Sequence, residues 1–142
     1  MSHVCKVELQ IKDLAALEAA CRAVGLELVR GQKTYRWYGD LNPGANRAYR
    51  RSETDGHCDH AIRIPGADGE EHEIGVARTA SGAYELRWDP MGRIVEMVGG
   101  SDARKLRQEY SSAVASKWYK QHGYRVSRSV KADGRIVLNA SK

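Results

Sequence analysis

Three short alternating segments in the middle of the chain constrain its fold most strongly. They read HAIRIPG from His60, EEHEIGVAR from Glu70 and AYELRWD from Ala83. Glycine-containing turns, at residues 66–69 and 80–82, separate them. Short strands joined by such turns usually pair as antiparallel neighbours. The sequence therefore predicts an antiparallel sheet at the centre of the fold.

The segment that precedes this sheet predicts one strand, one helix and a hairpin. Residues 3–11 alternate between polar and apolar side chains, which is typical of a half-buried strand. Asp13 then predicts the N-cap of a helix that ends at Gly25. We expect strands at 26–29 and 34–38 to pair through a turn near Lys33.

The C-terminal third predicts a long helix followed by a hairpin. The helix should run from Asp102 to about Gln121 and end at Gly123. Residues 124–130 and 135–140 should then pair as strands. Six residues at helical spacing form a single apolar stripe that we expect to be buried: Ala103, Leu106, Tyr110, Ala113, Val114 and Trp118.

These elements predict an α+β fold. We expect one domain over residues 1–142, with an antiparallel sheet of roughly eight strands and two main helices on one sheet face. Each half contains a strand, a helix that ends in glycine and a hairpin. That order is consistent with two related βαββ halves, although short similarities of this kind also arise by chance.

The charge distribution indicates which kinds of partner the protein could bind, and the cysteine content indicates its cellular compartment. Residues 30–51 carry a net charge of +5, residues 52–102 carry −7 and residues 103–135 carry +7, which predicts a dipolar surface or two solvated faces. The three cysteines have no regular spacing and indicate reduced thiols in the cytoplasm. No apolar run approaches the roughly 18 to 20 residues of a membrane span, so we expect no membrane partner.

Two stretches carry a resemblance to a known family. They are the opening, MSHVCKVELQIKDLAALEAACRAVGLEL, and EIGVARTASGAYELRWD with the later EYSSAVASKWYKQHGYRV. Both resemble the Ycf35 family (domain of unknown function 1257), of a phage or bacterial type. The resemblance covers nearly the whole chain. It implies a Ycf35-like domain and a cytosolic protein, and it implies no reaction.

The stretch KTYRWYGDLNPGANRAYRR, residues 33–51, is the main candidate binding site. It combines arginines, which bind phosphate, with aromatic rings, which stack on bases, and a loop rich in Gly, Pro and Asn. We expect the strand at 58–63 to form a second wall. Tyr35 and Trp37 share one face and can equally be core residues. The predicted ligand-binding residues are Tyr35, Arg36, Trp37, Tyr38, Arg47, Tyr49, Arg50, Arg51, Cys58, His60 and Arg63.

Catalytic and metal sites are weaker interpretations. His57, Cys58 and His60 have zinc-binding side chains but poor spacing, so we expect no metal and no cofactor. A thiolate at Cys58 would need an orienting carboxylate from another element. The acidic run at 70–73 lies beside a glycine-rich turn and is more typical of a solvated loop tip.

We therefore predict a protein that is not an enzyme and that binds a small anionic ligand, such as a nucleotide. Sequestration of a signalling nucleotide is one such role. The first alternative is an adaptor that binds a protein partner through the basic helix 102–121, and the second is RNA binding. The sequence leaves the oligomeric state open.

Overall fold

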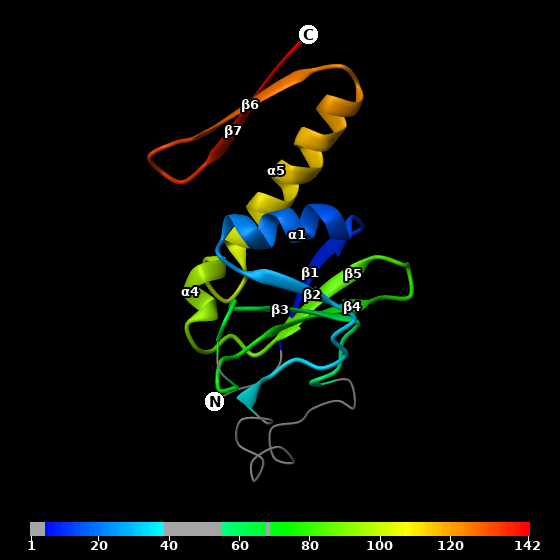
Figure 1. The fold of residues 1–142 in the computed structure, drawn as a ribbon, viewed down its shortest axis with the longest axis vertical. Coiled ribbons are helices and arrows are strands. Elements are labelled where there is room, and N and C mark those ends of the chain that lie inside the picture. The colour runs from blue at the N-terminus through cyan, green and yellow to red at the C-terminus, as the bar shows by residue number, and fades with distance from the viewer. Residues whose placement is uncertain (1–4, 39–54, 68) are drawn as a thin grey trace.

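A five-stranded antiparallel sheet forms the centre of the protein (Figure 1). The computed structural model describes residues 5–38, 55–67 and 69–142. For residues 5–9 it describes the backbone alone. The strand order is β1-β5-β4-β3-β2, so the first two strands of the chain lie at opposite edges. The strands are β1 (Cys5–Ile11), β2 (Glu27–Arg30), β3 (His60–Arg63), β4 (Ile74–Arg78) and β5 (Tyr84–Trp88).

Three helices cover one face of this sheet. They are α1 (Leu14–Ala23), α4 (Ile94–Val98) and the first half of α5 (Arg104–Gln121). Alternate residues of the central strands point toward them, so that Val76, Leu86 and Trp88 join the helices in one buried core. We call the sheet with these packed helices the body.

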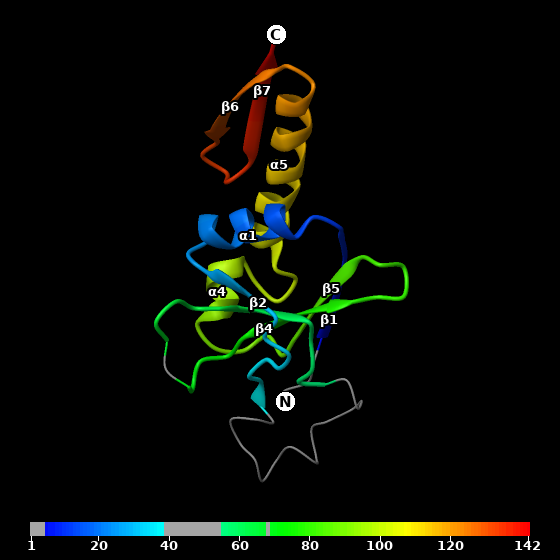
Figure 2. The same cartoon turned by 45° about the vertical axis from the view of Figure 1, so that its right-hand side comes forward.

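The C-terminal part of the chain extends away from the body. The second half of α5 continues beyond α1 and carries the hairpin of β6 (Arg125–Val130) and β7 (Ile136–Ser141) alongside it (Figure 2). We call residues 111–142 the arm. Every residue of the arm is half-buried or exposed, and none is buried. Arg128 of the hairpin holds it against α5 through two bonds of 2.7 Å to the Glu109 carboxylate.

The start of α1 and its link to α5 follow from two side chains. Asp13 is the N-cap, because its Oδ1 accepts a hydrogen bond from the Ala16 amide at 3.0 Å. The Tyr110 hydroxyl of α5 accepts hydrogen bonds from the amides of Lys12 and Asp13, at 3.0 and 3.2 Å. These bonds fix α5 to the junction between β1 and α1.

The second face of the sheet is covered by residues 34–37. Tyr35 and Trp37 are 1% and 0% exposed and form a second cluster with Ala61 of β3. Gly75 of β4 lies under the Tyr35 ring, where a Cβ atom would come within 2.4 Å of it. Small residues on this face thus make room for the two aromatic rings.

The expected hairpin of residues 26–29 with 34–38 is wrong. β2 pairs instead with β3, and of residues 34–38 only Thr34 forms a bridge, to His57. Carboxylates replace strand partners here: the Arg36 amide donates to Glu73 Oε1 at 2.9 Å and the Tyr38 amide to Asp89 Oδ2 at 2.6 Å. The alternation of aromatic residues therefore reflects burial against a sheet face and not membership of the sheet.

The α+β class is confirmed, and the finer description changes. The described residues form seven strands, five in one sheet and two in the other, together with three helices. The short helix α4 was not expected. In both halves a helix precedes an antiparallel strand pair, but β2 and β3 belong to the large sheet while β6 and β7 stand apart. A relationship between the halves stays a prediction.

Candidate functional site

The predicted wall at residues 35–38 forms part of the packed structure. Burial of Tyr35 and Trp37 confirms the interpretation of these residues as core and leaves no ring face open for stacking. Burial also raises the pKa of the Tyr35 hydroxyl.

Arg36 and Tyr38 are held by acidic side chains of the body. The Arg36 guanidinium lies 3.2 Å from Glu73 Oε2, and its Nε donates to the Glu71 carbonyl at 2.8 Å. Glu73 is 2% exposed and Asp89, which holds the Tyr38 amide, is 1% exposed. The expected solvated tip at residues 70–73 is therefore wrong at Glu73, which is a buried anchor for the segment that follows β2.

The side chains of the predicted second wall, residues 58–63, also form contacts with neighbouring parts of the fold. The Cys58 thiol donates to the Gln32 carbonyl at 3.3 Å, and burial raises its pKa to about 11. His60 Nδ1 accepts a hydrogen bond from the Gly31 amide at 2.9 Å, and burial lowers the pKa of its ring. Arg63 forms an ion pair with Glu27 on the neighbouring strand β2. A thiol with a raised pKa carries little thiolate at neutral pH, which disfavours nucleophilic chemistry at Cys58.

The remaining predicted ligand-binding residues, Arg47, Tyr49, Arg50 and Arg51, lie outside the described residues. Within residues 5–38, 55–67 and 69–142, no three His, Cys, Asp or Glu side chains are grouped so that they could hold a metal ion. Nor does any helix in these ranges have the length and apolar character needed to cross a membrane.

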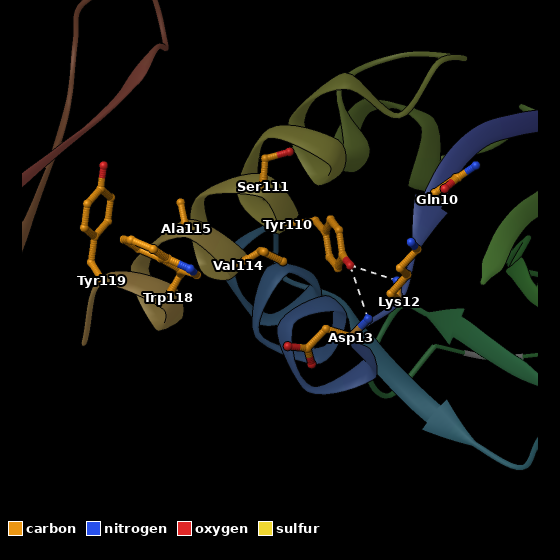
Figure 3. A pocket seen from close by; sticks show the side chains of 9 residues that line it. All are labelled: Gln10, Lys12, Asp13, Tyr110, Ser111, Val114, Ala115, Trp118 and Tyr119. Carbon is orange, nitrogen blue, oxygen red and sulfur yellow. Dashed lines mark hydrogen bonds between the residues drawn. The ribbon is translucent and has the colours of Figure 1, made fainter. Parts of the chain in front are cut away.

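An apolar groove lies where α5 leaves the body (Figure 3). It has a volume of about 580 Å³, and its surface is mostly carbon. Residues from the end of β1, the start of α1 and one side of α5 line it. They are Gln10, Lys12, Asp13, Tyr110, Ser111, Val114, Ala115, Trp118 and Tyr119.

Three residues one helical turn apart form the floor and wall of this groove. Tyr110 is buried and bound through its hydroxyl to the chain before α1, as the dashed lines in Figure 3 show. Val114 and Trp118 follow on the same side of α5 and are 37% and 51% exposed. Spacing of four residues places the three side chains along about 12 Å of helix.

Ring contacts hold Trp118 in place. Its indole stacks on the His122 ring, with centroids 3.9 Å apart, and meets the Tyr119 ring edge-on at 5.3 Å. These neighbours restrict the rotamers of the indole although half of its surface faces solvent. A large aromatic ring that is both exposed and held needs little ordering when it binds a partner.

The rim of the groove is basic. Lys12 lines the groove and is exposed, and the Lys117 ammonium lies 2.9 Å from Oδ2 of the lining residue Asp13. The hydrogen bond from Lys117, together with the Ala16 amide, holds the pKa of the Asp13 carboxyl below its usual range. The arm as a whole carries seven lysines and arginines against one aspartate, a net charge of +6.

The groove corrects the expectation of one continuous buried stripe on the C-terminal helix. Ala103, Leu106 and Tyr110 are buried, whereas Val114 and Trp118 are exposed. The sequence contains a signal for this difference. α5 has 18 residues, about 27 Å, while α1 has 10 residues, about 15 Å, and cannot cover its whole length.

Comparisons with known proteins give no relative from which a function could be inferred. No protein-family model matches the chain, and neither a curated protein nor a solved structure matches it. The resemblance to the Ycf35 family therefore stays a prediction.

Proposed function

We propose that the protein is a non-catalytic interaction module that binds an acidic segment of a partner protein in the groove beside Trp118. One observation carries the proposal: the apolar side of α5 continues past the body and ends in the exposed residues Val114 and Trp118. An apolar surface of this kind loses water on binding, which favours association. This is the adaptor function expected for the basic helix 102–121.

The chemistry of the groove favours a helical acidic segment. Its apolar floor extends over two turns of α5 and suits side chains at positions i, i+3 and i+4 of a second helix. Lys12 in the lining and Lys117 beside Asp13 complement aspartate or glutamate next to those side chains. A second copy that packed α5 against α5 would place two arms of net charge +6 together, which disfavours self-association.

Binding of a defined peptide tests the proposal. The probe is a synthetic helix with leucine every three or four residues and glutamate on its flanks. Trp37 and Trp88 are fully buried, so loss of acrylamide quenching on peptide addition reports protection of Trp118. We expect Trp118→Ala to weaken binding by about 2 kcal/mol, roughly 30-fold, as is common for a central aromatic anchor. For this variant, binding is followed by calorimetry.

Matched controls distinguish binding in the groove from non-specific hydrophobic or electrostatic binding. Val130→Ser removes an apolar side chain that is 60% exposed but lies outside the groove, and it should leave affinity unchanged. A peptide with lysine in place of glutamate should bind at least about tenfold more weakly. Equal binding of both peptides, or no binding of the acidic one, contradicts the proposal, and a concentration-dependent dimer in light scattering would identify a second copy as the occupant.

Binding of a small anionic ligand near residues 33–63 and RNA binding remain competing proposals. Among the residues expected there, Arg47, Arg50 and Arg51 lie outside the described residues. Arg50→Ala/Arg51→Ala should abolish thermal stabilisation by nucleotides if that ligand site exists. Lys12→Ala/Lys117→Ala should instead weaken binding of the acidic peptide. A cytoplasmic location likewise stays a prediction.

A further inference from the structure

We propose that a second cavity, between the first turns of α5 and the turn that joins β6 to β7, binds a small molecule with two or more phosphate groups. The cavity has a volume of about 650 Å³. That size is within the usual range for small-molecule sites. Its lining comes from two separate parts of the chain and consists of Gly99, Arg104, Lys105, Arg107, Gln108, Ser111, Asp133, Gly134 and Arg135.

The cavity concentrates positive charge from both elements. Arg104, Lys105 and Arg107 approach from α5 and Arg135 approaches from the hairpin, while Asp133 is the single acid among the lining residues. Asp133 Oδ2 lies 2.8 Å from Arg135 Nε, so its charge is directed at that arginine. No ion pair within the described residues engages the three cations of α5, and a net positive charge is left in the cavity.

The positions of these cations in the first turn of α5 do not stabilise the helix. The first turn of a helix is the positive end of its dipole and favours acidic side chains. This first turn has no acidic residue, and Ala103 at its N-cap provides no side-chain hydrogen bond. Arg104 and Lys105 are moreover exposed and add little to the core. A bound anion would remove the repulsion among the cations.

Hydrogen bonds keep the two walls of the cavity together. The Gln108 side-chain amide donates to the Gly134 carbonyl at 3.2 Å and thus ties the hairpin turn to α5. Arg128 and Glu109, the next residue of α5, make the second tie. The two walls that carry the cations are therefore held together before any ligand arrives, which reduces the entropy lost on binding.

The lining residues indicate the class of ligand. Guanidinium groups bind phosphate oxygens through paired hydrogen bonds, and several of them together suit more than one phosphate. No aromatic ring lines the cavity, so it offers no stacking surface for a base. Phosphate groups are thus the recognised feature, and a nucleoside or another organic part would extend outward.

Calorimetric titration with inorganic tripolyphosphate at low salt tests this site. A triple variant, Arg104→Gln/Lys105→Gln/Arg107→Gln, should weaken binding at least about 100-fold, because it removes three charge-assisted contacts. Its matched control is Lys117→Gln/Lys120→Gln/Arg125→Gln, which removes the same charge from the arm outside this cavity. The control should change affinity by less than about fivefold, through the long-range field alone.

Asp133→Asn gives a prediction of opposite sign. It removes the one acid of the lining and releases Arg135, so tripolyphosphate should bind more tightly, by about three- to tenfold. Adenosine triphosphate serves as a second probe, and tighter binding than tripolyphosphate would show that the nucleoside adds contacts. Circular dichroism of each variant checks that it is folded. Absence of tripolyphosphate binding, or equal losses in the two triple variants, would overturn the proposal.

Discussion

Among single residues, Gly75 shows most directly how the lack of a side chain makes room for a neighbouring ring. It faces the Tyr35 ring from the middle of β4, and its φ is not in the left-handed region. We expect Gly75→Ala to lower the free energy of unfolding by about 1 to 3 kcal/mol, because the new methyl group overlaps the ring.

Gly69→Ala is the control for this prediction, because a Cβ there meets nothing within 4 Å. Urea denaturation of both variants measures the difference. A Gly75→Ala protein as stable as the wild type would mean that Tyr35 can leave the sheet face without cost.

The Cys58 thiol provides a prediction about pH. With a pKa of about 11, it should carry about 0.1% thiolate at pH 8, against about 10% for a thiol of ordinary pKa 9. Alkylation of native protein followed by mass spectrometry should give a rate that rises toward pH 11. Because the pKa is raised in the folded state, the contribution of this thiol to stability is complete below pH 9 and is lost as pH increases toward 11.

Denatured protein provides the reference rate for alkylation of the same thiol. Cys21, whose pKa burial raises to about 12, should react still more slowly than Cys58. If native Cys58 reacted at neutral pH as fast as in the denatured chain, the thiolate interpretation would become tenable again.

At the scale of elements, the attachment of α5 depends on Tyr110. Its hydroxyl accepts two backbone amide hydrogens, from Lys12 and Asp13. Tyr110→Phe leaves both amides without this acceptor and should cost about 1 to 3 kcal/mol of stability. Tyr119→Phe, which removes a hydroxyl from the same groove without such bonds, should change stability by less than about 0.5 kcal/mol. Thermal denaturation compares the two, and equal losses would contradict this role of the hydroxyl.

Sequence patterns predict the elements of this protein better than their pairing. The caps at Asp13 and Gly25, the three central strands and the terminal hairpin follow from local spacing and turn chemistry. Residues 34–38 do not, because the amides of Arg36 and Tyr38 bind the carboxylates of Glu73 and Asp89, which are distant in the chain. Local patterns contain no information about such partners.

The candidate site was predicted only in part, for a related reason. Composition identified the basic C-terminal helix, but helical spacing cannot tell which end of an apolar stripe is covered. Coverage depends on the length and position of α1, which sets the point where Val114 becomes exposed. Conversely, the aromatic residues that suggested a ligand pocket at 35–37 are buried because they pack against the second face of the sheet, beside Ala61.

At the scale of the whole molecule, the body and the arm should differ in stability. Both faces of β4 are covered, whereas the arm contains no buried residue. Local opening costs least where few apolar contacts are lost. We expect amides of β6 and β7 to exchange hydrogen at least about 100-fold faster than those of β4, which corresponds to about 3 kcal/mol. Native-state hydrogen exchange with mass spectrometry measures this ratio, and uniform protection would mean that arm and body unfold together.

The position of β1 at one edge of the sheet has a consequence for biosynthesis. Its partner in the sheet is β5, and the register joins Cys5 to Trp88. While the ribosome makes the residues between them, β1 cannot yet pair with β5, and the loop that must close is long. Pairing over such a separation is slow in isolated domains. β1 is synthesised well before β5 and is therefore among the last strands of this sheet to be hydrogen-bonded, and until then its edge is exposed to other nascent chains and to chaperones.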